Sequence, residues 1–238
     1  MIALFLEGIH QKGLIVFINT AHKEDKMDTS GFMGGLYRLF DWISKMALLN
    51  LLWIFFSVLG LGLFGFFPAT AAMFAVMRKW IYGEDDIPVI RTFWTSYKRE
   101  FIKSNLLGGI ILAAGIVLCA DFLFIQNVAD ESLSLLYAPL LILVFLFVSM
   151  AFYVIPMFVH YDMKIGQVIK NSFFVMILNP VSTFSMVVGT FGICFALSYA
   201  PPIAILFSGN LIALIVMKFS SKSFDKVHAK SQMFLQEQ

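Results

Sequence analysis

Residues 43–80 contain the sequence ISKMALLNLLWIFFSVLGLGLFGFFPATAAMFAVMRKW, and this stretch decides how often the chain crosses a membrane. The apolar pattern is broken near its middle by Gly60, Gly62, Gly65 and Pro68. About 20 residues are needed to cross a hydrocarbon core of about 30 Å, so a stretch of this length fits two tightly joined spans better than one. The sequence therefore predicts a first span at residues 43–61 and a second that continues to Trp80.

The composition of the whole chain supports a membrane protein. Hydrophobic residues make up 60% of the 238 residues and charged residues only 13%. A soluble domain is closer to half apolar and a quarter charged. So few charges could not cover this much apolar surface in water, so the excess is expected to face lipid. The net charge of +2 is too small to indicate a nucleic-acid-binding surface.

Outside the opening stretch, apolar runs alternate with polar segments. The remaining predicted spans are residues 105–125, 135–159, 181–199 and 203–217. Residues 81–103 and 160–177 carry apolar side chains at helical spacing among polar ones, which is typical of helices lying in the membrane interface. The predicted fold class is an all-α transmembrane bundle of six spans with two cytoplasmic interfacial amphipathic helices.

The distribution of basic residues predicts the orientation. All 17 Lys and Arg residues fall before or at the start of the first span, in residues 78–103, in the segment after the fourth span, or after Met217. Because Lys and Arg are enriched in cytoplasmic segments, both ends of the chain are predicted to lie in the cytoplasm. Residues 1–34 and 220–238 would then flank a membrane domain at 35–219. Met27 is an alternative start, which would make residues 1–26 extra sequence.

Three polar side chains inside predicted spans are candidate functional residues. Asn50 and Asn210 carry amides, which are costly in hydrocarbon unless they are paired, so helix–helix contacts are the first interpretation and ligand contact the second. Asp121 is the one carboxylate clearly within a span, and its position near the outer end favours an interfacial residue over a proton-coupling one. Tyr153 is a weaker candidate of the same kind.

The basic segment after the second span is a candidate docking surface. Its apolar stripe comprises Ile90, Phe93, Trp94, Tyr97 and Phe101. Its bases are Arg91, Lys98, Arg99 and Lys103. Bases on such a helix can bind anionic headgroups or the carboxylates of a protein partner.

Sequence motifs of catalysis and metal binding are not found. The four histidines are scattered without metal-ligand spacing, and neither a Gly-x-Ser-x-Gly motif nor a phosphate-binding glycine loop occurs. Cys119 and Cys194 lie inside apolar runs and are interpreted as packing residues. The prediction is a non-enzymatic protein without cofactor or metal, and without a nucleic-acid partner.

Several runs resemble the YesL-like family of bacterial membrane proteins. They are LLNLLW at 48–53, FPATAA at 67–72 and VMRKW at 76–80, followed by the basic segment 93–101 and by Asn179-Pro180. The resemblance extends over about residues 35–222. The family has no established activity, but its members tend to be encoded beside carbohydrate uptake transporters and polysaccharide-degrading enzymes.

The resemblance thus implies an accessory role in carbohydrate (oligosaccharide) uptake, with subunits of an ABC transporter as partners. It carries no catalytic residue over to this chain. The alternative is a transport permease subunit in its own right, because six spans with cytoplasmic ends and an amphipathic helix after the fourth span match that plan. Against it, residues 164–180 lack the Glu-Ala-Ala…Gly…Leu-Pro coupling sequence of importers.

Overall fold

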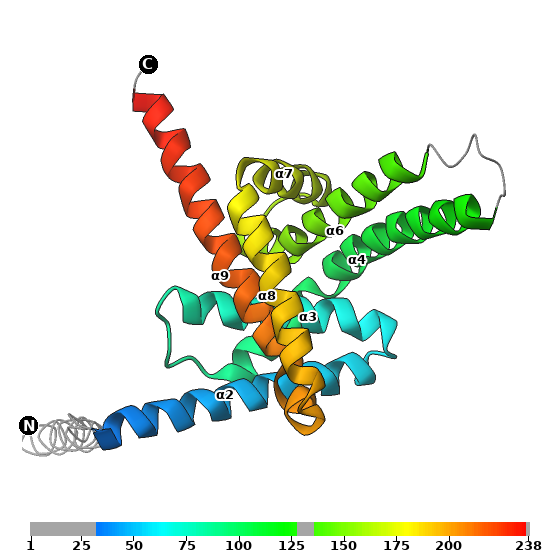
Figure 1. Cartoon of the computed structure of the whole chain (residues 1–238). Coiled ribbons are helices and arrows are strands. Elements are labelled where there is room, and N and C mark those ends of the chain that lie inside the picture. Colours follow the sequence, from blue (N-terminus) through cyan, green and yellow to red (C-terminus); the bar gives the residue numbers. More distant parts are fainter. Residues whose placement is uncertain (1–31, 128–135, 237–238) are drawn as a thin grey trace, which may run out of the picture. The chain divides into compact units, whose positions relative to one another are not determined.

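A computed structural model describes residues 32–127 and 136–236, and within these ranges the chain is helical without strands (Figure 1). The helices are α2 (Phe32–Leu59), α3 (Leu63–Ile81), α4 (Val89–Asn127), α6 (Tyr137–His160), α7 (Ile165–Leu178), α8 (Pro180–Ser198) and α9 (Pro201–Gln236). The alternative start at Met27 and most of the predicted connector between spans three and four lie outside the described residues.

The chain divides into two compact units, residues 1–45 and 46–238. The described part of the first unit is the beginning of α2, where Asp41 and Lys45 form an ion pair of 2.7 Å one helical turn apart. Leu39 and Phe40 are exposed there. The second unit contains the rest of α2 and all the other helices.

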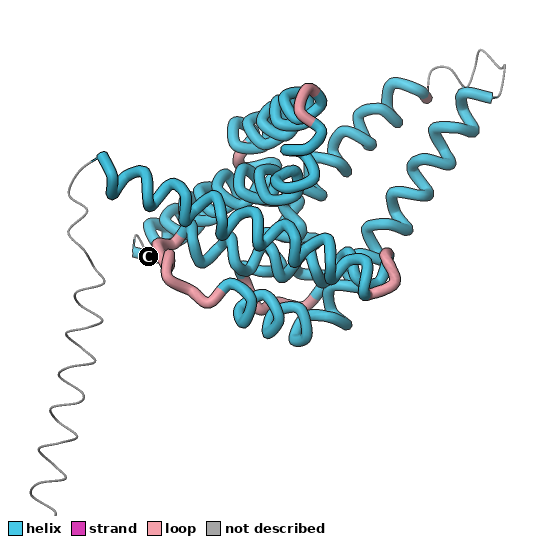
Figure 2. Tube along the Cα trace, turned by 90° about the horizontal axis from the view of Figure 1, so that it is seen from below, coloured by secondary structure: helices cyan, strands magenta, loops and turns pink. Residues whose placement is uncertain are grey.

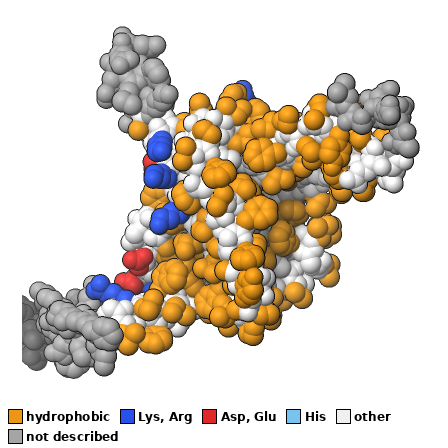
Figure 3. All heavy atoms as spheres, viewed as in Figure 1, with side chains coloured by type: hydrophobic (Ala, Val, Ile, Leu, Met, Phe, Trp, Pro, Cys, Tyr) orange, Lys and Arg blue, Asp and Glu red, His pale blue; other side chains and the backbone are white. Residues whose placement is uncertain are grey.

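In the described part of the chain, five helices are long and apolar enough to cross a membrane: α2 from Gly35, α4, α6, α8, and α9 as far as Ala229. Exposed hydrophobic side chains cover most of the face seen in Figure 3. The prediction of an all-α membrane protein is confirmed. The second predicted span corresponds to α3, which has 19 residues and carries Arg78 and Lys79 in its last turn.

The first two predicted spans are separate helices joined by a tight turn. Leu61 and Gly62 both adopt positive φ angles, 61° and 71°, which turn the chain back on itself. Beyond the turn, α3 passes so close to α2 that a Cβ atom on Gly65 would lie 2.5 Å from the carbonyl oxygens of Phe56 and Ser57. Glycine is therefore required for this backbone contact.

Helix α4 corrects one predicted boundary. The basic segment up to residue 103 and the span at 105–125 were expected to be separate, yet they form one uninterrupted helix of 39 residues. Its sequence contains no proline, and the apolar stripe of its first half packs onto the α2–α3 hairpin. Phe93 and Tyr97 are buried, with ring centres 5.4 and 5.0 Å from that of Phe56. The first amphipathic segment is thus a packed extension of a span and not a separate interfacial helix.

Two further segments follow the predictions in part. The second amphipathic segment forms α7, which buries Val168 and Met176 and packs mainly against α6. The sixth predicted span ends at Met217, but α9 continues as a helix through the predicted tail to Gln236.

Helix α3 is at the centre of the second unit and packs against α4, α6 and α9. Its buried residues are Gly65, Pro68, Ala69, Ala71, Ala72, Met73, Phe74, Val76 and Met77. Small side chains let helix backbones approach closely in a membrane, which explains why this alanine-rich helix is the central one. In contrast, the far halves of α4 and α6 run side by side away from α3 (Figures 1 and 2).

Candidate functional site

Asn50 and Asn210 lie at the same contact between α2 and α9. The side-chain amide of Asn50 donates to the carbonyl oxygen of Ile205 at 2.8 Å, and the amide of Asn210 donates to the carbonyl oxygen of Met46. Both asparagines are fully buried. Each helix therefore receives a hydrogen bond from an amide on the other, and we call this pair the amide clasp.

The amide clasp leaves two acceptors unused. The Oδ1 atoms of Asn50 and Asn210 have no hydrogen-bond partner among the described residues. A Cβ on Gly209 would lie 2.9 Å from Oδ1 of Asn50, so the small residue makes room for the amide. The arrangement can hold two helices together, which agrees with the first interpretation of these residues.

Asp121 lies apart from the amide clasp. It is exposed, close to the end of α4, and makes no ion pair with another described residue. Tyr153, in contrast, is fully buried and its hydroxyl lies 3.0 Å from Oγ1 of Thr183, which links α6 to α8. The three polar residues predicted inside spans thus separate into one pair and one distant carboxylate.

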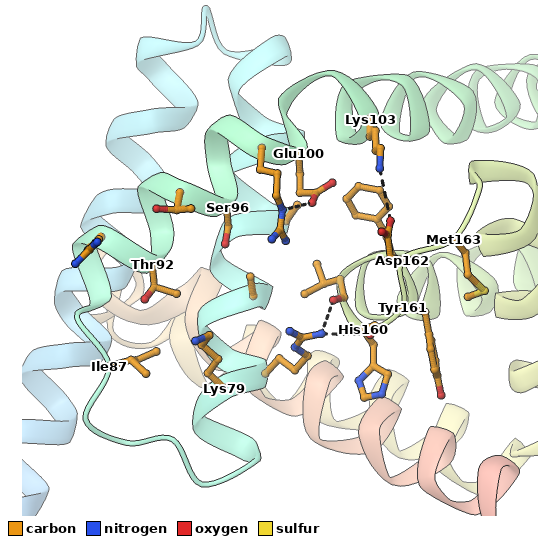
Figure 4. A pocket seen from close by; sticks show the side chains of 18 of the residues that line it. Lys79, Ile87, Thr92, Ser96, Glu100, Lys103, His160, Tyr161, Asp162 and Met163 are labelled. Atoms are coloured by element: carbon orange, nitrogen blue, oxygen red, sulfur yellow. Dashed lines mark hydrogen bonds and ion pairs between the residues drawn. The ribbon is translucent and has the colours of Figure 1, made fainter.

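A polar cleft of about 690 Å³ lies between α3, the first half of α4 and the end of α6 (Figure 4). We call it the cationic cleft. The basic side chains that line it are Arg78, Lys79, Arg91, Arg99 and Lys103. Its two carboxylates are Glu100 and Asp162. Basic residues from two consecutive helices therefore surround one hollow.

Of the four predicted docking bases, three line the cationic cleft and one does not. Arg91, Arg99 and Lys103 belong to the cleft. Lys98 lies elsewhere on α4, with its Nζ atom 4.8 Å from the ring centre of Trp94. At 100° per residue Lys98 lies on the same side of α4 as Arg91, at the edge of the cleft-lining face, and of the two only Arg91 contributes to the lining.

Arg78 connects α3 to the end of α6 along one wall of the cleft. Its Nη1 atom donates to the carbonyl oxygens of Val159 and His160, at 2.8 and 3.2 Å. These carbonyls belong to the last turn of α6, which has no intrahelical donors for them and carries the negative end of the helix dipole. One guanidinium thus stabilises the end of α6 and lines the cleft.

An aromatic cluster holds the other side of the α6 end. The rings of His160 and Tyr161 pack on Phe224 of α9, with centres 5.1 and 5.7 Å from it. The hydroxyl of Tyr82 donates to Asp225 at 3.2 Å. Burial raises the pKa of Tyr82 and of Tyr161, and the negative charge of Asp225 raises both further. Both phenols are therefore neutral at physiological pH.

Sequence reasoning missed the contribution of α3 and of the segment after α6 to the cleft. Arg78 and Lys79 were interpreted as the inner end of a span, and Asp162 was not singled out. The one signal was the proximity of Arg78 and Lys79 to the basic segment that follows them in the sequence. No pattern in the sequence indicates that Arg78 meets His160, because the contact joins residues far apart along the chain. Within the described residues, no three His, Cys, Asp or Glu side chains are placed to hold a metal ion.

The apolar helices, the small-residue core and the amide clasp define an integral membrane protein of the helical-bundle class. The family described as "Protein of unknown function, DUF624" matches residues 46–122, which include α3 and the basic half of α4. The chain belongs to this family, and the predicted YesL-like relationship is confirmed.

Three proteins of Bacillus subtilis strain 168 are similar to the chain. The uncharacterized protein YteU is 43% identical over 192 residues, which cover 81% of this chain and 86% of YteU. The uncharacterized protein YesL is 36% identical, over 83% of this chain and 93% of YesL. The uncharacterized protein YesV is 31% identical, over 82% and 94% of the two chains. No solved structure matches the chain.

Proposed function

We propose that this protein is a non-enzymatic accessory component of carbohydrate uptake that holds a subunit of an ABC transporter in the membrane. The link to carbohydrate follows from the gene neighbourhood that the family resemblance implies. The observation that best supports a docking role is the C-terminal half of α9. It continues from a membrane span as one helix and presents a row of exposed lysines.

These lysines form a surface that we call the basic ridge, comprising Lys218, Lys222 and Lys226. All three are exposed and lie four residues apart. The buried face of the same helix comprises Asn210, Ala213, Val216, Met217, Ser220, Ser221, Ser223 and Phe224. At 100° per residue the two sets lie on opposite faces of the helix. Figure 3 shows Lys and Arg side chains gathered along this part of α9.

The basic ridge suits an acidic segment of a protein partner. Its helix is anchored by buried side chains as far as Phe224, so the charges are held in a fixed row. A preorganised surface loses less conformational entropy when it binds. Complementary charge also speeds the encounter of two proteins in the same membrane.

Affinity purification from native membranes tests this role. We expect the unaltered chain to recover a permease subunit of a carbohydrate importer, and the triple variant Lys218→Gln, Lys222→Gln, Lys226→Gln to lose it. The control Arg38→Gln, Lys98→Gln, Lys170→Gln removes the same charge elsewhere and should retain the partner. Equal recovery with both triple variants would refute docking through the basic ridge.

The same preparations test the alternative role as a permease. Liposomes that contain only the purified chain should not take up labelled oligosaccharide if it is an accessory protein. Uptake by the chain alone would favour the permease.

The topology that accompanies this proposal has both ends in the cytoplasm of a bacterial cell and the chain in the inner membrane. In a variant without Cys119 and Cys194, a cysteine at Asn127 should react with an impermeant maleimide outside whole cells. A cysteine at Lys222 should react only after permeabilisation. Reaction of both in intact cells would contradict this orientation.

The α2–α3 hairpin brings the chain back to the cytoplasmic side of the membrane. This holds whether the turn lies within the membrane or beyond its outer face. The hydroxyl of Tyr97 is 3.4 Å from the carbonyl oxygen of Phe56, so the turn lies close to the bases that follow Tyr97. We therefore propose that the hairpin does not cross completely, which departs from the two full spans predicted from the sequence, and we expect a cysteine at Leu61 to be protected from the external reagent. Labelling of Leu61 from outside would instead support the six predicted spans.

A further inference from the structure

The cationic cleft contains more positive charge than its own carboxylates neutralise. Lys79 pairs with Glu84 at 3.2 Å, outside the cleft lining. The two acids of the cleft are also engaged, since Arg99 pairs with Glu100 at 2.6 Å and Lys103 with Asp162 at 3.6 Å. Among the described residues, Arg78 and Arg91 then have no carboxylate partner. Gathering like charges in this way is unfavourable without an anion to offset them.

Arg78 has hydrogen-bonding capacity to spare. A guanidinium has five N–H donors, and the two bonds of Arg78 to the end of α6 both come from Nη1. The bonds to α6 also hold the side chain in one position. A fixed guanidinium loses little conformational entropy when a ligand binds, so Arg78 is preorganised to donate to an anion.

Hydroxyl groups complete the lining of the cleft on the α4 side. Thr92, Thr95 and Ser96 share a helical face and line the hollow together with Arg99. Figure 4 shows Thr92 and Ser96 on one side of the hollow and His160 and Asp162 on the other. The volume of about 690 Å³ is within the range of small-molecule sites.

We propose that the cationic cleft binds a phosphate-bearing anion, with Arg78 and Arg91 as its principal ligands and the α4 hydroxyls as additional donors. Phosphate oxygens accept several hydrogen bonds at once and match the planar fork of arginine. The phosphate belongs either to a soluble phosphoester or to the headgroup of an anionic phospholipid. This site is distinct from the basic ridge, and the proposal does not depend on the docking role of α9.

The test for a soluble ligand uses the full chain in a neutral detergent and inorganic phosphate as the probe. Thermal unfolding is followed while phosphate is raised at constant ionic strength with sodium chloride as the background. We expect a saturable rise in Tm. The variant Arg91→Gln should need about tenfold more phosphate for half of the effect, the scale of one hydrogen bond to a charged group. Arg91 is exposed, so its replacement leaves the core intact.

The matched control is Lys98→Gln, which removes a positive charge from the same helix outside the cleft and should respond as the unaltered chain does. The test for a lipid ligand places the three proteins in nanodiscs of phosphatidylcholine with or without phosphatidylglycerol. Stabilisation by phosphate identifies a soluble phosphoester as the source. Stabilisation by phosphatidylglycerol alone identifies a headgroup.

With either phosphate or phosphatidylglycerol, the stabilisation must weaken in Arg91→Gln and persist in Lys98→Gln. The proposal is overturned if neither probe stabilises the chain or if Arg91→Gln and Lys98→Gln respond equally. It is also overturned if a glutamate-rich peptide stabilises the chain through Arg91 more strongly than phosphate does, because the cleft would then be a protein-docking site. None of these measurements involves Lys218, Lys222 or Lys226. A result that overturns phosphate binding in the cleft therefore does not affect the proposal that the basic ridge binds a partner.

Discussion

Helix α3 and the far halves of α4 and α6 are all apolar, but they differ in how much of their surface is buried against other helices. Of the 19 residues of α3, nine are buried, and most of these are alanine, glycine or methionine. The far halves, residues 109–127 and 137–148, contain no fully buried residue. We call these two segments the arm. The arm is rich in leucine, isoleucine and phenylalanine, yet it packs least.

The difference shows which property of a sequence reports packing in a membrane protein. Lipid tails are as apolar as leucine, so a large apolar side chain gains no hydrophobic free energy by leaving lipid for another helix. Small residues and polar groups instead favour helix contacts, through close backbone approach and interhelical hydrogen bonds. Large apolar side chains, as in the arm, therefore indicate surface that faces lipid. Small side chains, as in α3, indicate the packed core.

The strongest test of this comparison is a pair of glycine substitutions. Gly65→Ala should destabilise the chain by about 3 kcal/mol, because the new Cβ meets backbone atoms that cannot move aside. Gly109→Ala, at the start of the arm, meets no atom within 4 Å and should be neutral or stabilising by up to about 1 kcal/mol. Thermal unfolding in detergent measures both. Equal effects would show that α3 and the arm are packed alike.

A second test makes one substitution at two places on α4. Leu107 belongs to the buried core and is 0% exposed, and Leu123 in the arm is 52% exposed. Leu107→Ala should cost about 2 kcal/mol, at the low end of core truncations because no transfer from water is lost in a membrane. Leu123→Ala should change the free energy of unfolding by less than about 0.5 kcal/mol. A large loss at Leu123 would mean that another protein surface covers the arm.

The amide clasp should have a smaller effect than either packing test. Asn50→Leu should insert normally but destabilise the chain by about 1 kcal/mol, the scale of interhelical hydrogen bonds in membranes. The double variant with Asn210→Leu should deviate from additivity, because both amides join the same helix pair. Unchanged thermal stability in Asn50→Leu would mean that its bond to Ile205 contributes nothing.

The smallest effect is expected at Asp121. The residue is exposed on the arm, so Asp121→Asn should leave abundance and thermal stability within about 0.5 kcal/mol of the unaltered chain. Under the proposed role in carbohydrate uptake, growth on the imported carbohydrate should also be unchanged. A sharp loss of growth with normal abundance would instead make Asp121 a coupling or ligand-binding residue and give the arm a function of its own.

The sequence predicted features that depend on local composition. The five long apolar helices and the glycine-rich break after Leu59 follow from hydropathy and from the conformational freedom of glycine. It also grouped Arg91, Arg99 and Lys103, which the structure places in one cleft, because charge next to an apolar run is conspicuous. The boundary between the basic segment and the third span was not predictable, since a helix continues wherever no residue breaks it.

What remained hidden was every feature made by residues distant in the chain. Sequence patterns placed Asn50 and Asn210 in separate spans, but only packing brings α2 and α9 together and gives each amide a carbonyl on the other helix. Likewise, Arg78 donates to the carbonyl oxygens of Val159 and His160 only because α3 packs against the end of α6. The sequence alone determined that the chain enters a membrane, because hydropathy is a sum over neighbouring residues. The tertiary structure decided which polar groups meet, because those contacts depend on which helices pair. The hydropathy of neighbouring residues carries no information about helix pairing.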